Sequence, residues 1–244
     1  MARFFIAGTN LLNGPRVIIR GRDAEHVQVL RIRPGEDVTI CDTQGTDYKC
    51  RLVRADKEQV EAEVIEVVPC PAEPSVKVTV LCGLPKGDKT EYIIQKCVEA
   101  GASEILFFNA KRCVAKPDMP EKKLERWQRI SEEAAKQSGR GIIPHVGWAG
   151  EYADALNVAV HTDLALFMYE TGEREKLDEV LNAHKDIQTA AIVTGPEGGF
   201  AEFEADLARM VGLHVCSMGE RILRCETAPV VALTATMYAT GNLS

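Results

Sequence analysis

A glycine-rich segment at 194–200 is the first candidate for chemistry, because Gly195, Gly198 and Gly199 fall within five residues. Such spacing lets the backbone approach a ligand closely and adopt positive φ angles. A phosphate cradle is one interpretation, but the segment lacks both the P-loop lysine and the dinucleotide-binding glycine spacing, and Glu197 would repel a phosphate. The segment suits a hydroxyl, an amine or a cation better. A tight strand-to-helix turn without a ligand explains the glycines equally well.

A second polar segment, 218–229, mixes charged and apolar residues. It carries two arginines and two glutamates, and it leads into a helix expected to begin near Thr227 and Pro229. A helix N-terminus favours anionic or polar ligand groups. A solvated run of charges is the alternative, and Ile222 and Leu223 argue against it because they require the segment to be partly buried.

Two further polar clusters fall on or near expected helices. The first places Lys86, Asp88 and Lys89 before a helix that carries Lys96 and Glu99. The second cluster lies on and just after an expected long helix. A functional cluster and a core tryptophan beside a solvated helix face are equally good interpretations of it. Its members are Arg126, Trp127, Glu133, Gln137, Ser138 and Arg140.

The sequence contains no spacing typical of metal ligands. Its five histidines are widely scattered, and its eight cysteines form no C-x-x-C pair. We therefore predict no metal centre. The cysteines fall mostly in apolar segments, which predicts free and mostly buried thiols in a reducing compartment.

Residues 75–244 alternate expected strands with expected helices, which predicts an α/β domain with a mostly parallel sheet. Ligands of such sheets bind at the carboxyl ends of the strands, where both polar segments fall. The expected strands are Val76–Cys82, Glu104–Asn109, Leu164–Tyr169, Thr189–Thr194 and Leu213–Ser217. The expected helices are Thr90–Ala100, Glu121–Ser138, Phe203–Val211 and Pro229–Ala239.

Residues 1–70 have a different pattern, with short apolar or alternating runs separated by turn signals. This pattern predicts a small β-barrel. The expected strands are Arg16–Ile19, Val38–Cys41, Tyr48–Val53 and Val60–Val68. Prolines then cluster at positions 69, 71 and 74, so we predict a stiff linker at 71–74 and a domain boundary there.

The composition excludes a disordered or fibrous chain, because 45% of the 244 residues are hydrophobic and 27% are charged. No apolar run is long enough for a membrane helix, and the N-terminus becomes polar too early for a signal peptide, which predicts a cytoplasmic protein. The net charge of −7 argues against a nucleic-acid partner at first sight. However, residues 1–54 hold nine basic against six acidic residues, so the predicted barrel is locally basic.

Several segments together match one known family. The two most specific are Gly195–Gly199 and Gly219–Ala228, in this order and about twenty residues apart. On these residues the chain resembles the RsmE-type 16S rRNA (uracil-N3)-methyltransferases of the SPOUT superfamily, over essentially its whole length. Further matching segments are Arg3–Phe5, His26–Arg31 with Pro34-Gly35, Lys86–Lys89, Lys96–Gly101 and Glu133–Arg140.

The resemblance implies a fold and an activity. The fold would be α/β, with a small N-terminal PUA-like β-barrel that binds RNA and a C-terminal SPOUT α/β domain with a deep trefoil knot. A homodimer would methylate N3 of a specific uridine in the decoding region of 16S rRNA in the small ribosomal subunit. S-adenosylmethionine would lie bent in the knot, in contact with three loops.

The resemblance also implies which residues hold the cofactor. Backbone groups of Met218, Leu223 and Gly199 would bond the adenine edge, and Ile222 and Leu223 would enclose the ring. The expected cofactor residues are Leu166, Met168, Tyr169, Thr194, Gly195, Pro196, Glu197, Gly198, Gly199, Met218, Gly219, Arg221, Ile222, Leu223, Thr227 and Ala228.

Methylation of uridine N3 requires the loss of a weakly acidic ring proton, so a positioned cation is the most useful catalytic group and a general base comes second. We expect Arg224 to stabilise the developing negative charge or an RNA phosphate, and Glu226 or Glu197 to serve as base or orienting group. The target base must also leave its stack. The residues expected to hold the RNA are Arg3, Arg31, Lys86, Lys89 and Arg140.

Three other functions are compatible with parts of this pattern. A SPOUT methyltransferase could act on another rRNA or tRNA position, such as a ribose 2′-oxygen. A non-catalytic RNA-binding assembly factor could keep the fold and lose the cofactor. A nucleotide-binding module built on the glycine segment is a third alternative, which the missing P-loop lysine disfavours.

Overall fold

The computed structural model describes residues 2–6, 15–56, 59–115 and 119–243. The chain folds into two compact units. The first unit contains residues 1–73 and 135–143, and the second contains 74–134 and 144–244. The sequence-based boundary lies at 71–74, close to the first of these divisions. The sequence did not indicate that residues 135–143 would pack with the first unit.

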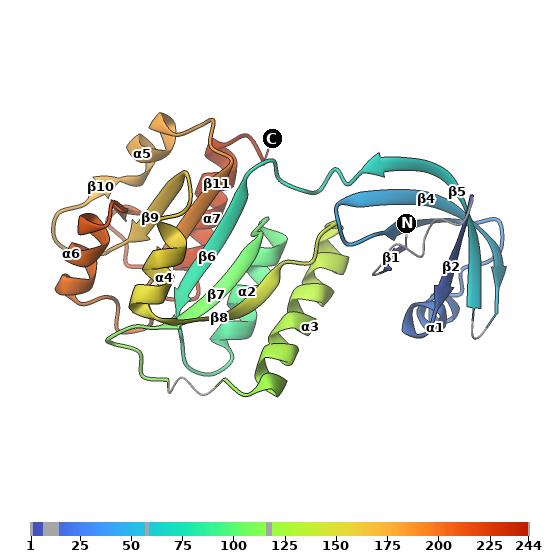
Figure 1. Ribbon diagram of the computed structural model, residues 1–244, viewed down its shortest axis with the longest axis horizontal. Coiled ribbons are helices and arrows are strands. Elements are labelled where there is room, and N and C mark those ends of the chain that lie inside the picture. The colour runs from blue at the N-terminus through green and yellow to red at the C-terminus, as the bar shows by residue number, and fades with distance from the viewer. Residues whose placement is uncertain (1, 7–14, 57–58, 116–118, 244) are drawn as a thin grey trace. The chain divides into compact units, whose positions relative to one another are not determined.

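The first unit contains a curled five-stranded sheet, one complete helix and the last residues of a second, α3 (Glu121–Ser138) (Figure 1). The strand order is β1-β3-β4-β5-β2, and the edge strands β1 and β2 do not pair with each other within the described residues. The sequence predicted a closed barrel. The strand pairs of the described residues instead form a curled sheet that does not close. The elements are β1 (Arg3–Phe5), β2 (Arg16–Arg20), α1 (Arg22–Val29), β3 (Asp37–Cys41), β4 (Thr46–Ala55) and β5 (Gln59–Pro69).

Local irregularities in the β4–β5 pair contribute to the curl. The register between these antiparallel strands shifts at Lys49/Cys50 and again between Leu52 and Arg54. Extra residues of this kind bend a strand and increase its twist. Helix α1, which the sequence analysis missed, places Ala24 and Val27 one turn apart in the core of this unit.

Residues 135–143 are held to the first unit by a buried ion pair. The Arg140 guanidinium lies 2.8 Å from a carboxylate oxygen of Glu73, and its side chain is only 3% exposed. The other Glu73 oxygen accepts hydrogen bonds from the backbone N–H groups of Gly141 and Ile142, at 2.7 and 3.0 Å. One carboxylate thus binds a buried arginine and two backbone donors of the same segment.

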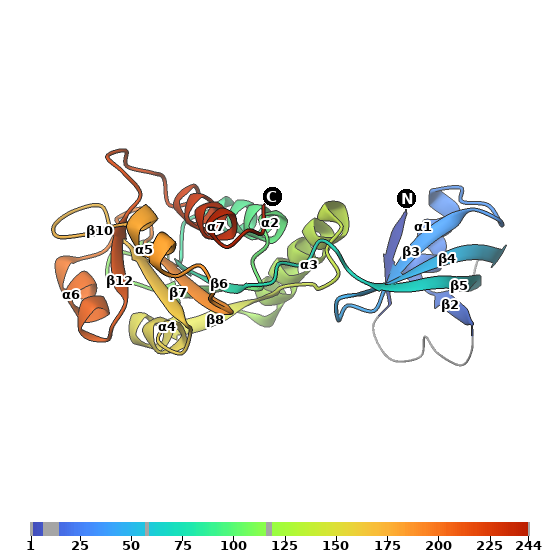
Figure 2. The same ribbon diagram turned by 90° about the horizontal axis from the view of Figure 1, so that it is seen from above.

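The second unit is built on a seven-stranded sheet in which all pairs of neighbouring strands are parallel (Figures 1 and 2). The strand order is β10-β12-β9-β11-β6-β7-β8. This confirms the expected α/β class. The strands are β6 (Lys77–Gly83), β7 (Glu104–Asn109), β8 (His145–Glu151), β9 (Leu164–Met168), β10 (Glu175–Lys176), β11 (Thr189–Thr194) and β12 (His214–Ser217).

Helices cover the sheet of the second unit on both faces. Helices α4 and α6 pack on one face, where Phe167, Phe200 and Tyr152 form part of the core. Helix α7 packs against β6 and β11 and also against α2. The helices are α2 (Lys89–Glu99), α3 (Glu121–Ser138), α4 (Tyr152–Ala159), α5 (Leu177–Ala183), α6 (Glu202–Met210) and α7 (Ala228–Ala239).

The expected helices and strands of this unit agree with the structure to within one residue at most ends. Trp127 is buried and packs on Phe107 with ring centroids 4.8 Å apart, so the core interpretation of this tryptophan is confirmed. Strands β8 and β10 and helices α4 and α5 were not among the expected elements. In β8 the sequence pattern is weak, because Gly147 and Gly150 interrupt the apolar residues.

Candidate functional site

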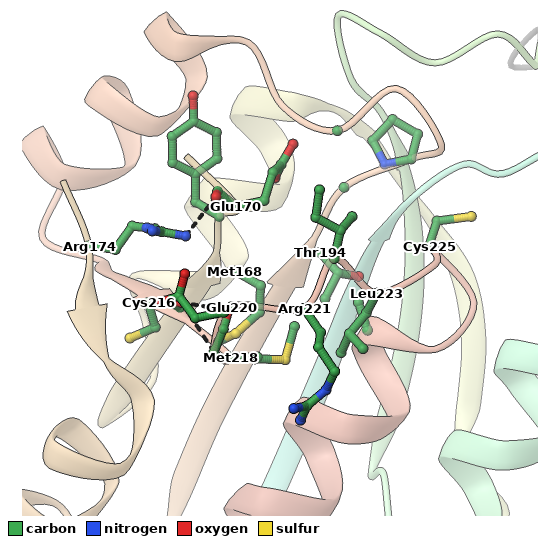
Figure 3. A pocket seen from close by; sticks show the side chains of 18 residues that line it. Met168, Glu170, Arg174, Thr194, Cys216, Met218, Glu220, Arg221, Leu223 and Cys225 are labelled. Atoms are coloured by element: carbon green, nitrogen blue, oxygen red, sulfur yellow. Dashed lines mark hydrogen bonds between the residues drawn. The ribbon is translucent and has the colours of Figure 1, made fainter. Parts of the chain in front are cut away.

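A cavity of about 240 Å³ opens where three neighbouring parallel strands end. Strands β12, β9 and β11 lie side by side in that order, so the loops that follow them meet at one edge of the sheet. In Figure 3, Met168, Met218 and Cys216 gather on one side, with Thr194 and Leu223 on the other. The lining residues are Met168, Tyr169, Glu170, Arg174, Thr194, Gly195, Pro196, Gly199, Cys216, Ser217, Met218, Gly219, Glu220, Arg221, Ile222, Leu223, Cys225 and Ala228.

The glycines of the loop after β11 allow close backbone packing at this cavity. A Cβ atom on Gly199 would lie 2.2 Å from a carboxylate oxygen of Glu170, and Gly199 has a φ of +63°. A Cβ atom on Gly195 would lie 3.3 Å from backbone atoms of Gly199. Both glycines line the cavity, so the segment forms a tight turn and also part of the cavity wall.

Most of the expected cofactor residues line this one cavity, and four do not. Leu166 is fully buried in the middle of β9, and Thr227 occupies the N-cap position of α7 without a side-chain capping bond. Gly198 packs on Arg112, whose guanidinium donates to its carbonyl oxygen at 3.1 Å. Glu197 is directed to Lys89, as described below. The expected residues at the cavity are Met168, Tyr169, Thr194, Gly195, Pro196, Gly199, Met218, Gly219, Arg221, Ile222, Leu223 and Ala228.

Six lining residues were missed by the sequence analysis. Glu170 and Arg174 belong to the loop after β9, and the Arg174 guanidinium donates to the Glu170 carbonyl oxygen at 2.6 Å. The rule that ligands bind at the carboxyl ends of strands could have found Glu170, because it follows Tyr169 directly. The full missed set is Glu170, Arg174, Cys216, Ser217, Glu220 and Cys225.

A second polar cluster lies beside the cavity and is centred on Lys89, the first residue of α2. The Lys89 ammonium lies 3.1 Å from a carboxylate oxygen of Glu197 and 3.5 Å from one of Glu226. It also lies 3.6 Å from the Cys225 sulfur, and the Cys225 thiol donates to Glu226 at 3.2 Å. The Lys86 backbone N–H donates to Glu197 at 2.9 Å. The structure therefore brings together two expected catalytic carboxylates and an expected RNA-binding lysine.

The contacts in this cluster shift the pKa values of its members. Burial raises the pKa of Glu197, but hydrogen bonds from the Lys86 backbone and from Lys89 outweigh burial and leave that pKa lowered. Burial also raises the pKa of Glu226, but hydrogen bonds from its own backbone and from Cys225, together with the charge of Lys89, leave that pKa lowered. Hydrogen bonding to Glu197 raises the pKa of Lys89, and burial together with Glu226 raises that of Cys225 to about 12. At neutral pH the cluster holds two carboxylates, an ammonium and a thiol.

Arg224, the expected catalytic cation, has an exposed side chain and does not line the cavity. Its carbonyl oxygen accepts hydrogen bonds from the backbone N–H groups of Thr227 and Ala228, both at 2.9 Å. These bonds fix the backbone of Arg224 at the start of α7 and leave its guanidinium at the surface.

The expected RNA-binding residues other than Lys89 fall into two environments. Arg3 forms a bidentate pair with Asp47, at 2.9 and 2.6 Å, and its side chain is mostly buried. Arg140 is buried against Glu73. Arg31 and Lys86, in contrast, are exposed. The structure thus gives Arg3 and Arg140 partners within their own unit and leaves the side chains of Arg31 and Lys86 accessible.

In the described part of the chain, no group of three or more histidine, cysteine, aspartate or glutamate side chains is arranged to hold a metal ion. None of the helices described is long and apolar enough to cross a membrane. All eight cysteines are free, and all except Cys113 are buried, as expected from the sequence.

The two sheets correspond to the two domains of an RNA methyltransferase. A model described as an RNA methyltransferase domain matches residues 72–237, and one described as an RNA methyltransferase PUA domain matches residues 19–65. More particularly, the chain belongs to the ribosomal RNA small subunit methyltransferase E family. The family member from Bacillus subtilis is 37% identical, and the match covers 100% of this chain and 98% of that protein.

Solved structures agree with this assignment. The ribosomal RNA small subunit methyltransferase E of Neisseria gonorrhoeae, bound to S-adenosylmethionine, has a TM-score of 0.83 and 31% identity, and covers 98% of this chain and 97% of that one. A putative methyltransferase of Legionella pneumophila, also with bound S-adenosylmethionine, has a TM-score of 0.82 and 27% identity, and 97% of each chain is covered.

Proposed function

We propose that this protein transfers a methyl group from S-adenosylmethionine to N3 of a specific uridine in 16S rRNA of the small ribosomal subunit. The observation that carries the proposal is the cavity at the ends of β9, β11 and β12, which combines both family-specific motifs. The family assignment supports the reaction class, and the two neighbours with bound S-adenosylmethionine support the cofactor.

The chemistry of the cavity wall fits S-adenosylmethionine. This cofactor carries a sulfonium, an ammonium and a carboxylate, and it has no phosphate. The cavity offers carboxylates from Glu170 and Glu220 for the cationic groups and guanidinium groups from Arg174 and Arg221 for the carboxylate. Ile222 was expected from the sequence to be partly buried, and it is instead 84% exposed at the cavity. Such an apolar side chain can cover a flat adenine ring. When bound, the cofactor supplies an electrophilic methyl group.

The remaining catalytic task is to remove the N3 proton and to stabilise the negative charge that spreads onto the flanking carbonyl oxygens. We assign charge stabilisation to Arg224, whose exposed guanidinium can reach a bound RNA chain. Glu197 and Glu226 have lowered pKa values and are paired with Lys89, which makes them weak bases at neutral pH. Their pairing favours an orienting role over proton abstraction.

The first unit, together with Lys86 of the second unit, would hold the RNA. Arg31 and Lys86 are accessible, and residues 1–54 carry more basic than acidic side chains. Phosphate contacts of this kind supply affinity that falls with salt. A deep trefoil knot in residues 75–244 and a homodimer with its active sites near the dimer interface complete the proposal.

The test is methyl transfer from labelled S-adenosylmethionine onto small ribosomal subunits from a strain that lacks this modification. We expect one label per subunit, and mass spectrometry of the nucleosides should identify 3-methyluridine. A different methylated nucleoside would support another SPOUT methyltransferase. Absence of both transfer and cofactor binding by calorimetry would instead support a non-catalytic assembly factor.

A further inference from the structure

Lys89 stands out among the basic residues near the cavity because its ammonium lies between two carboxylates. Its side chain is 33% exposed, and its ammonium contacts Glu197 of the loop after β11 and Glu226 of the loop after β12. Both carboxylates belong to the segments that form the cavity wall, next to Pro196 and Cys225. The lysine therefore joins two loops that α6 and β12 separate in the sequence.

The geometry points to Lys89 as a positioning residue that clamps two cofactor loops together; this inference rests on the proposed function. Without the ammonium, two ionised carboxylates would face each other across a short gap. Repulsion would separate Glu197 from Glu226 and move Pro196 and Cys225 with them. The Cys225 sulfur contacts both Lys89 and Glu226, and in Figure 3 it points away from Met168 and Met218. The clamp thus lies behind the cavity wall.

This role differs from the RNA contact expected from the sequence. A lysine that binds RNA must offer its donors to phosphate oxygens, whereas the Lys89 donors already point to Glu197 and Glu226. Two nearby carboxylates also repel a phosphate. Lys86, three residues earlier, has an exposed side chain and contributes only its backbone N–H to the cluster. RNA contact and loop positioning are therefore divided between these two lysines.

The experiment measures S-adenosylmethionine binding by calorimetry for the full chain and three variants. We expect Lys89→Met to weaken binding roughly three- to tenfold, the scale of a partly exposed ion-pair network. The double variant Lys89→Met/Glu226→Gln should recover most of this loss, because it removes one of the two repelling charges. Lys96→Met is the matched control, since Lys96 lies on the same helix, is 34% exposed and pairs with Glu99 at 2.9 Å.

The outcomes separate the inference from the function on which it rests. Unchanged binding in Lys89→Met, an equal loss in Lys96→Met, or no recovery in the double variant would each overturn the positioning role. If the unmodified protein itself bound no S-adenosylmethionine, the proposed function would fail instead. Circular dichroism melting curves verify that each variant is folded, and recovery by a second substitution cannot result from a loss of folding.

Discussion

Arg140 and Lys89 are both cations in polar clusters of the sequence, and folding gives each of them acidic partners. Arg140 is buried against Glu73, whereas Lys89 joins Glu197 and Glu226 at the cavity. Residue type therefore did not separate structural cations from RNA-binding ones. Accessibility separates them, because a cation that contacts phosphate must keep its donors free for the RNA.

At the residue scale, Glu73→Gln should lower the stability of the first unit by about 2 kcal/mol at pH 7, because it leaves a buried arginine without a counter-charge. Burial raises the pKa of Glu73, but hydrogen bonds from Arg140 outweigh burial and leave the pKa lowered. The stabilisation is therefore complete above the unfolded-state pKa and is lost as pH falls through the folded-state value.

Urea unfolding at several pH values measures this effect. The curves of the variant and the unmodified protein should converge as the pH is lowered below about 4. The control is Glu179→Gln, since Glu179 is 66% exposed and pairs with Lys176 at the surface. If the stability difference between Glu73→Gln and the unmodified protein stayed constant down to acid pH, the ionised Glu73 carboxylate would not be the source of the stabilisation.

A second residue-scale prediction concerns Arg224. We expect Arg224→Ala to lower kcat on ribosomal subunits roughly a hundredfold, the usual cost of one charge-stabilising donor, with an unchanged Kd for S-adenosylmethionine. Arg221→Ala provides the contrast, because Arg221 lines the cavity and its loss should weaken cofactor binding. Near-normal turnover by Arg224→Ala with intact cofactor binding would remove Arg224 from the mechanism.

At the element scale, the loop after β11 determines the shape of the cavity. Gly199 has a left-handed φ of +63°, and it allows the Glu170 carboxylate to approach its Cα. Pro196 in turn packs on Gly83 at the end of β6, where a Cβ atom would lie 2.6 Å from the proline ring. The neighbouring strands β6, β11 and β9 therefore fix this loop through close backbone contacts.

Gly199→Ala tests this element directly. The new methyl group would displace the Glu170 carboxylate from the cavity wall, and we expect roughly tenfold weaker S-adenosylmethionine binding by calorimetry. Gly212→Ala is the matched control, because Gly212 has a φ of +94° and open space around its Cα. Both variants should lose about 1 kcal/mol of stability to backbone strain. Equal cofactor affinity in the two variants would argue against a role for Glu170.

At the scale of the whole molecule, charge is divided unevenly along the chain. The net charge is −7, yet residues 1–54 are net positive, and the excess of acid lies in the rest of the chain. The net charge of the chain therefore bears on its solubility, whereas the accessible basic residues determine its attraction to RNA. Arg31 in the first unit and Lys86 in the second are such residues.

We expect Arg31→Ala/Lys86→Ala to weaken RNA binding and to reduce the slope of log affinity against log salt by about two, one per lost phosphate contact. Fluorescence anisotropy with a labelled 16S rRNA fragment measures both quantities. Calorimetry with S-adenosylmethionine should show no change in cofactor affinity. Lys176→Ala, which removes an exposed lysine paired with Glu179, serves as the control. An unaltered salt slope would exclude these two residues from the RNA surface.

The sequence by itself determined the α/β class, most helices and strands of the second unit, and the loops after β9, β11 and β12 as the candidate site. These features are local, because strand and helix periodicity and glycine-dependent turns depend on neighbouring residues. The missed elements are short or interrupted by glycine, so their periodicity was too weak to detect. They are β1, α1, β8, α4, β10 and α5.

Only the tertiary structure decided which side chains share an environment. Glu197 and Lys89 are 108 residues apart, Arg140 and Glu73 are 67 apart, and Glu170 meets Gly199 across two strands. The Glu197–Lys89 and Glu170–Gly199 contacts form because parallel neighbours in the sheet are distant in sequence. Arg140 meets Glu73 because residues 135–143 pack with the first unit, and local sequence pattern carries no record of either arrangement. The sequence therefore supplied the chemical groups of the site, and the order of the strands decided which of them are neighbours.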